Sequence, residues 1–229
     1  MDDNITRRPK SLQTAVTMFC AMNLNRRVYI FRHGETDWNL NRRIQGHTDI
    51  PLNARGSAQA EELAQRLQRC PIEVILSSDL ARARQTAEVV AAQLAVPVYF
   101  DPRLREASLG EAEGLTVEEV VARFGGSAWD KWRSTDPADW EFHFPGGEPK
   151  RSTLERSSKA LEDFLGQHPF GTVAVSTHGG VIRTLVGSCV TGGSDAISIQ
   201  NCAVHVMDRH AHEWKYVGLD EADGDSPEF

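Results

Sequence analysis

The chain contains 229 residues, of which 40% are hydrophobic and 25% are charged, and its formal net charge at pH 7 is −7. These values are ordinary for a globular protein, and the length allows one large domain or two small ones. No apolar run approaches the roughly 20 residues that a membrane-spanning helix needs, and clusters of Lys or Arg with interleaved aromatic residues are missing. The composition therefore argues against a membrane protein and against a nucleic-acid-binding protein.

The N-terminal residues 1–26 are polar and mixed, and they include only a short apolar stretch, AVTMFCAM, without a convincing signal-peptide cleavage site. We expect a loose arm in this part of the chain. Met18 and Met22 are alternative starts to Met1, because the ordered pattern begins only at Val28.

Three short apolar runs, at 28–31, 74–76 and 173–175, alternate with segments of helical periodicity. Such alternation is typical of a mostly parallel sheet with helices on both faces. Two helical stripes follow the first two runs, one at positions 60, 63, 64 and 67 and one at positions 80, 83, 87, 90, 91 and 94. The sequence predicts a three-layer α/β fold.

Local signals mark the later elements. Two capping boxes, at Thr116 to Glu119 and at Ser152 to Glu155, predict helix starts. The stretch 123–147 is rich in Trp, Gly and Pro, so we expect an inserted cap or long loop within about 107–150. Positions 203–207 and 213–217 alternate like two strands of a hairpin or a sheet edge, and the last ten residues carry five acids, which predicts a disordered tail over 220–229.

Each of the three apolar runs ends in polar residues. The first leads into Arg32-His33-Gly34, the second into Ser77-Ser78 with Arg82 one turn later, and the third into a segment that contains His178 and Gly179. Ligands of open α/β sheets bind at the carboxyl ends of the strands, near helix N-termini that attract anions. We therefore expect two histidines and two arginines to converge on one anion site.

This set of residues suits phosphoryl transfer. Arginines supply forked donors to the phosphoryl oxygens, and a neutral imidazole acts as a nucleophile that forms a phosphohistidine. The leaving alkoxide needs a proton, for which Glu106 is the candidate, with Glu111 and Glu113 as rivals. Arg84 is a rival of Arg82.

Six motifs, in this order, make the chain similar to the histidine phosphatase superfamily, which is also called phosphoglycerate mutase-like. They are RHGETDWN, QGHTDIPLNARGSAQA, LSSDLARARQTAE, LREASLG, PGGE and STHGGVIRTL, which together span about residues 28–188. Each motif alone is modest, but the ordered set is highly specific. The resemblance implies the phosphoglycerate mutase-like α/β fold and a reaction that needs no metal and no other cofactor.

The resemblance also implies roles for individual residues. His33 matches the nucleophile, Glu106 matches the proton donor, and Arg32, Arg82 and His178 match the remaining members of the phosphate pocket. Further substrate-binding positions are matched by Asn39, Gln45, Gly46 and Gly179.

Three departures from the family pattern affect the choice of reaction. Many members have Trp-Glu-Gly where this chain has Ala112-Glu113-Gly114, and the serine that commonly follows Pro-Gly-Gly-Glu is Pro149. The longer basic, proline-rich insertion of the mutases is absent from residues 107–150. The last difference favours a phosphatase, in which water accepts the phosphoryl group from His33.

Other conspicuous side chains have simpler interpretations. Trp129, Trp132 and Trp140 are expected to be packing anchors, with a place at the substrate entrance as the alternative. The histidines at 205, 210 and 212 lack an acidic or cysteine partner, so we interpret them as solvated surface residues rather than metal ligands.

We conclude that residues 27–219 form one domain, a metal-independent phosphatase for a small phosphorylated metabolite, although a phosphoprotein substrate stays open. The four widely spaced cysteines form no CxxC pair, and a cytoplasmic location fits them best. One alternative is a phosphoglycerate-mutase-type isomerase, and another is a non-catalytic phospho-ligand-binding protein on the same fold. The sequence does not indicate the oligomeric state.

Overall fold

The computed structural model describes residues 25–134, 136–189, 199–211 and 213–219. Their central element is a six-stranded sheet with the order β3-β2-β4-β1-β5-β6. The strands are β1 (Arg26–Arg32), β2 (Val74–Ser77), β3 (Val98–Phe100), β4 (Thr172–Thr177), β5 (Val204–His210) and β6 (Glu213–Leu219). The three predicted apolar runs form β1, β2 and β4, and the short strand β3 was not predicted.

The register of the sheet brings the ends of three strands together. β1 and β2 both pair in parallel with β4, so that Arg32 lies opposite Thr177 and Ser77 lies opposite Ser176. β5 and β6 run antiparallel and complete the edge beyond β1. The carboxyl ends of β1, β2 and β4 therefore meet at one edge of the sheet, as the sequence predicts.

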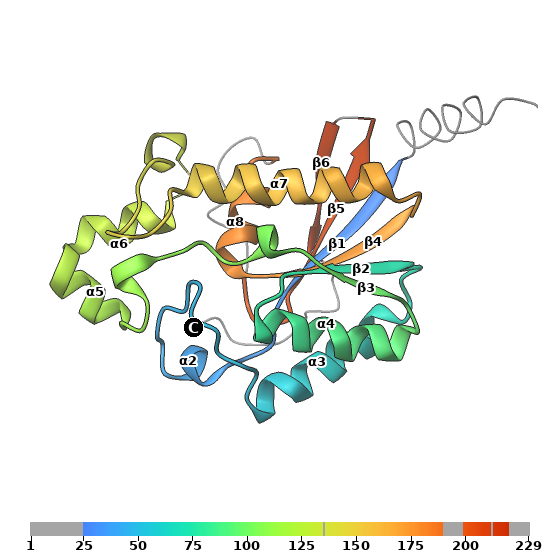
Figure 1. Ribbon diagram of the computed structural model, residues 1–229, viewed down its shortest axis with the longest axis horizontal. Coiled ribbons are helices and arrows are strands. Elements are labelled where there is room, and N and C mark those ends of the chain that lie inside the picture. The colour runs from blue at the N-terminus through green and yellow to red at the C-terminus, as the bar shows by residue number, and fades with distance from the viewer. Residues whose placement is uncertain (1–24, 135, 190–198, 212, 220–229) are drawn as a thin grey trace, which may run out of the picture.

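Helices cover both faces of the sheet, which confirms the predicted three-layer architecture (Figure 1). Alternate residues of β1 point to opposite faces, since Val28 and Ile30 belong to one core cluster and Tyr29 and Phe31 to the other. The first cluster is closed by α7 (Lys150–Gln167) and α8 (Gly179–Gly187), and the second by α3 (Ala54–Leu67) and α4 (Ala81–Leu94).

The two predicted capping boxes have different outcomes. At Thr116, the side chain accepts from Glu119 N and the Glu119 carboxylate accepts from Thr116 N, and α5 (Val117–Phe124) begins there. The box at Ser152 is wrong, because α7 already begins at Lys150 behind Pro149. Pro149 is the N-cap, with an extended backbone (φ −61°, ψ 148°), so Ser152 lies inside the first turn instead of before it.

Residues 107–150 form short helices around a small core of their own. The elements of this region are η2 (Gly110–Ala112), α5, α6 (Gly126–Arg133) and η3 (Pro137–Asp139). Two further short helices, α2 (Asp37–Leu40) and η1 (Pro102–Leu104), lie earlier in the chain. Buried Phe144 contacts the rings of Phe124, Trp132 and Phe142 in this core. In Figure 1, α5 and α6 lie to one side of the layers formed by the sheet and its covering helices.

One sequence interpretation is wrong at the edge strands. His205 is fully buried, and its Nδ1 lies 3.1 Å from the Tyr216 hydroxyl. Its strand β5 is paired on both sides, with β1 and with β6, so position 205 lies inside the sheet. His210 is exposed, as expected for a surface residue, and His212 lies outside the described residues.

The predicted tail at 220–229 and residues 1–24 of the predicted arm also lie outside the described residues, whereas Arg26 already belongs to β1. None of the described helices is long and apolar enough to span a membrane.

Candidate active site

A cavity of about 250 Å³ opens at the carboxyl edge of β1, β2 and β4. It lies between this edge and the helices of residues 107–150. Eight of the nine predicted site residues line it, namely Arg32, His33, Asn39, Gln45, Gly46, Arg82, Glu106 and Gly179. The ninth, His178, is fully buried directly behind His33.

His33 follows the last residue of β1 and is only 2% exposed. Its backbone N–H donates to Thr177 O, which ties it to the neighbouring strand β4. Its Nδ1 lies 2.7 Å from Gly34 O. Because a carbonyl oxygen can only accept, Nδ1 carries the proton and the neutral ring keeps its lone pair on Nε2.

The rings of His33 and His178 lie 5.2 Å apart between centroids. Burial, followed by the positive charges of Arg82 and Arg32, holds the pKa of His33 well below its usual value. The pKa of His178 is also held well below its usual value, first by burial and then by Arg82. Both imidazoles are thus neutral at physiological pH, the state that a nitrogen nucleophile requires.

Arg32 and Arg82 both line the cavity. Arg82 is 1% exposed and donates through its two Nη atoms to Thr48 O and Gly46 O, at 2.9 and 2.8 Å. Arg32 Nη1 donates to Ile199 O at 2.6 Å. The Nε atoms of both arginines are buried and have no hydrogen-bond partner among the described residues. The two guanidinium groups bring two positive charges to the cavity, which favour an anion there.

Burial lowers the pKa of Arg82 to about 10, against the opposing influence of the Glu106 carboxylate. The guanidinium therefore stays charged at neutral pH. Arg84, the rival on the same helix, is half exposed and forms an ion pair with Glu88. The structure thus brings Arg82, and not Arg84, to the cavity.

Glu106 is held at the cavity by backbone donors. Its Oε1 accepts from Ala107 N at 2.9 Å, and its Oε2 accepts from Gly180 N at 3.0 Å. A Cβ at position 180 would lie 2.4 Å from Glu106 Oε1, so the glycine leaves room for the carboxylate. The N-terminus of α8 therefore fixes the candidate acid.

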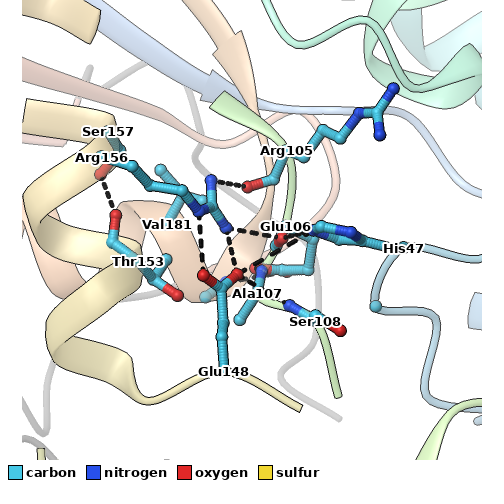
Figure 2. A network of polar contacts seen from close by, with 12 residues as sticks. His47, Arg105, Glu106, Ala107, Ser108, Glu148, Thr153, Arg156, Ser157 and Val181 are labelled. Atoms are coloured by element: carbon cyan, nitrogen blue, oxygen red, sulfur yellow. Dashed lines mark hydrogen bonds and ion pairs between the residues drawn. The ribbon is translucent and has the colours of Figure 1, made fainter. Parts of the chain in front are cut away.

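Arg156 of α7 braces the backbone that leads up to Glu106 and the Glu106 carbonyl itself, as Figure 2 shows for Arg105 and Glu106. Arg156 Nη1 donates to Arg103 O and Arg105 O, each at 2.7 Å, and Nη2 donates to Glu106 O at 2.8 Å. Glu148 accepts from Arg156 Nε and Nη2. Burial alone would raise the pKa of Glu148. The hydrogen bonds from Arg156 and Ser108 outweigh burial and bring the pKa below its usual value, so this carboxylate stays charged.

Two further contacts complete this network. Ser108 N donates to Glu148 Oε1 at 2.9 Å, and His47 Nε2 donates to Glu106 O at 2.7 Å from the opposite side (Figure 2). Three side chains from separate segments, His47, Glu148 and Arg156, thus hold one short loop in place.

The two rival carboxylates are engaged outside the cavity. Glu113 accepts from His47 N, Thr48 N and Leu109 N, which fastens the loop that follows α2. Glu111 is exposed and pairs with Arg123. Among the three candidate acids, the structure brings Glu106 alone to the cavity.

Sequence reasoning missed several residues around the site. Asn201 Nδ2 donates to His33 O at 2.9 Å, and Thr86 Oγ1 accepts from Gly34 N at 3.0 Å. No local pattern marks either residue, because each reaches the site from a distant segment. Trp129 and Trp132 combine both expected roles, since they pack on the small core and line the cavity, whereas Trp140 does not line it.

Four cations in the cavity wall were also missed, namely Arg43, Arg133, Lys150 and Arg183. Lys150 is 3% exposed, and burial lowers its pKa to about 8. Within the described ranges, no group of three or more His, Cys, Asp or Glu side chains could hold a metal ion.

Comparison with known proteins agrees with this geometry. The family model for the histidine phosphatase superfamily (branch 1) matches residues 28–222. A Salmonella choleraesuis protein named probable phosphoglycerate mutase GpmB is 32% identical over 190 residues, which cover 82% of this chain and 86% of that protein.

Solved structures of phosphatases are similar over most of this chain. A mycobacterial glucosyl-3-phosphoglycerate phosphatase in complex with VO3 is 29% identical with a TM-score of 0.75, over 85% of this chain and 97% of that one. A phosphoserine phosphatase mutant of Entamoeba histolytica, in complex with phosphoserine, is 25% identical with a TM-score of 0.69, over 86% of this chain and 98% of that one.

Proposed function

Because the chain belongs to the histidine phosphatase superfamily, we propose that it hydrolyses phosphate monoesters of small metabolites through a phosphohistidine on His33. The observation that carries this proposal is the set of groups around one cavity: an unprotonated Nε2 on His33, the guanidinium groups of Arg32 and Arg82, and a carboxyl group on Glu106. The small cavity volume supports a metabolite rather than a protein as substrate.

In the first step, His33 Nε2 attacks phosphorus and the bond between phosphorus and the ester oxygen breaks. Glu106 gives its proton to the leaving oxygen, so the product departs as a neutral alcohol. Arg32 and Arg82 hold the phosphoryl oxygens and stabilise their charge in the transition state. His178 lies beside the His33 ring, and its buried Nδ1 has no partner among the described residues, so it is available to the same oxygens.

In the second step, water attacks the phosphohistidine. The Glu106 carboxylate takes one proton from this water, the bond between phosphorus and Nε2 breaks, and its electron pair returns to the ring. Inorganic phosphate leaves, and both side chains are restored. No residue in either step requires a metal ion.

The relative named probable phosphoglycerate mutase favours one alternative reaction. A mutase would protect the phosphohistidine from water and return the phosphoryl group to a second oxygen of the bound sugar acid. Conversion of 3-phosphoglycerate to 2-phosphoglycerate without net release of phosphate would identify this reaction.

The cytoplasm is the proposed location. Neither Cys70 nor Cys189 forms a disulfide in the part of the chain that the structure describes. This state supports a reducing compartment.

The test is phosphate release from a panel of small phosphate monoesters in the presence of EDTA, with the native chain and with His33→Ala. We expect release by the native chain and loss of about 10⁴-fold or more in kcat for the variant, as when another catalytic nucleophile is removed. His210→Ala serves as the matched control, because His210 is an exposed histidine. Activity that EDTA abolishes, or that His33→Ala retains, would overturn the proposal.

A further inference from the structure

The turn that contains His47 is held by two side chains. Arg82 donates to the carbonyls of the residues before and after His47, to Gly46 O at 2.8 Å and to Thr48 O at 2.9 Å. The Glu113 carboxylate accepts from His47 N at 2.9 Å and from Thr48 N at 3.0 Å. Carbonyls and amides of this turn are therefore both fixed, and the His47 side chain starts from a rigid base.

The His47 side chain crosses from this turn to the loop that carries Glu106 (Figure 2). Its Nε2 lies 2.7 Å from Glu106 O, and since a carbonyl oxygen can only accept, Nε2 carries the proton. The nearest oxygen of Glu148 lies 3.9 Å from the same nitrogen, which is beyond hydrogen-bond range. Within the part of the chain that the structure describes, the ring therefore makes one hydrogen bond, and it goes to the candidate acid.

His47 thereby connects the two groups that act on the bond to be broken. In the proposed reaction Arg82 holds the phosphoryl oxygens, and Glu106 protonates the leaving oxygen, which is one bond away from phosphorus. A continuous path runs from Arg82 through the backbone of the turn and the His47 ring to Glu106 O. The spacing of the two groups has to match a single bond, and a misplacement of about 1 Å can cost about 10²-fold in rate.

The other supports of this loop do not provide the same connection. Arg156 holds Glu106 O from α7, but it makes no hydrogen bond with the turn at 46–48 among the described residues. Glu113 links the turn to Leu109 N, three residues beyond the acid. His47 is thus the described side chain that connects the turn directly to Glu106.

We propose that His47 is a positioning residue that sets the distance between the phosphoryl site and the candidate acid. The inference rests on the proposed phosphatase function and adds to it a residue that acts through Glu106, because His47 does not line the cavity. Its loss should therefore affect protonation of the leaving group more than binding of the ester.

A series of leaving groups tests this role through kcat/KM, which reports transfer of the phosphoryl group to His33. The shorter side chain of His47→Asn places its amide out of reach of Glu106 O. We expect kcat/KM for alkyl phosphates to fall by about tenfold or more. For p-nitrophenyl phosphate, whose leaving group needs no proton, it should stay close to native. An equal loss for both kinds of ester would overturn the proposal.

Two further variants assign the effect to the hydrogen bond. His47→Gln places an N–H donor close to the position of Nε2 and should restore most of kcat/KM for alkyl phosphates. His143→Asn is the matched control, because His143 is exposed, has its Nδ1 3.1 Å from Phe144 O and does not line the cavity.

The ratio of kcat/KM for the two kinds of ester is measured within each variant, so partial unfolding does not affect it. The control should keep the native ratio. If His47→Gln and His47→Asn gave the same ratio, the proposal would be wrong.

Amide hydrogen exchange separates this inference from the proposed reaction. Ala107 N donates to Glu106 Oε1 and Ser108 N donates to Glu148 Oε1, so both amides report the state of this loop. We expect both to exchange about tenfold faster in His47→Asn and at the native rate in His47→Gln, whether or not the chain hydrolyses any ester. Unchanged exchange in His47→Asn would overturn the positioning role while the phosphatase stands.

Discussion

The two walls of the cavity are built in different ways. The inner wall consists of Arg32, His33 and Arg82 beside the ends of β1 and β2, fixed by hydrogen bonds to neighbouring backbone. The outer wall has two parts: α6, which carries the exposed Arg133 and rests on a separate small core, and α8, which carries the half-buried Arg183 and packs on the sheet. Because every phosphate monoester presents the same phosphoryl group, a rigid inner wall suits the chemistry, and an outer wall that is partly supported by its own core suits the choice of substrate.

The largest effect is expected from Glu106, which lines the cavity together with the inner wall. Glu106→Gln should lower kcat by about 10²- to 10⁴-fold for alkyl phosphates, because an amide cannot protonate the leaving alkoxide. The loss should be much smaller for p-nitrophenyl phosphate, whose leaving group needs no proton. Steady-state kinetics with both esters provide the measurement, and an equal loss for both would argue against Glu106 as the acid.

The brace behind the inner wall should have the next largest effect. Arg156→Lys keeps the charge but loses the fork that holds the carbonyls of Arg105 and Glu106. We expect kcat for alkyl phosphates to fall by about 10- to 100-fold with little change in KM, because small misplacements of a catalytic group are costly. The rate with p-nitrophenyl phosphate should fall less. A change confined to KM would mean that Arg156 has no part in positioning Glu106.

A defect in the outer core should act on binding instead. Phe144→Ala should reduce stability by about 3–5 kcal/mol and raise the KM of the preferred ester while kcat is largely kept. Phe164→Ala is the matched control, because Phe164 packs in the cluster on one face of the sheet. The control should cost comparable stability without the change in KM. Equal effects of the two variants on KM would contradict the independence of the two walls.

The smallest effect is a dependence of stability on pH. His33 and His178 stay neutral in the folded chain because burial and Arg82 hold their pKa values well below the ordinary 6.5. The unfolded chain binds these protons below about pH 6.5, so this contribution to stability is present above that pH and is lost as the pH falls below it. Urea midpoints at pH 8 and pH 5.5 measure it. His178→Gln should flatten the difference, and His210→Gln should leave it unchanged.

The sequence predicts the inner wall well, because its residues follow apolar strands in contiguous motifs. Strand ends in a parallel sheet must meet at one edge, so Arg32, His33 and His178 could be brought together without knowing any distance. The outer wall was not predictable in this way. Lys150 and Arg183 are single basic residues in amphipathic helices, and their approach depends on how α6, α7 and α8 pack.

Two errors have local physical causes. The capping box at Ser152 was wrong because α7 begins earlier, at Lys150. His205 was misjudged because its burial depends on the pairing of β5 with β1 and β6, which the local sequence does not show. The short strand β3 was missed because its three residues are too few for a periodic pattern.

In the proposed reaction, His33 carries the phosphoryl group during turnover. Rapid quenching with an alkyl phosphate labelled at phosphorus, followed by peptide mapping, tests it directly. We expect an acid-labile, base-stable label on the peptide that contains His33, formed within one turnover and absent from His33→Ala. A label on another residue, or hydrolysis without a labelled chain at any time after mixing, would contradict it.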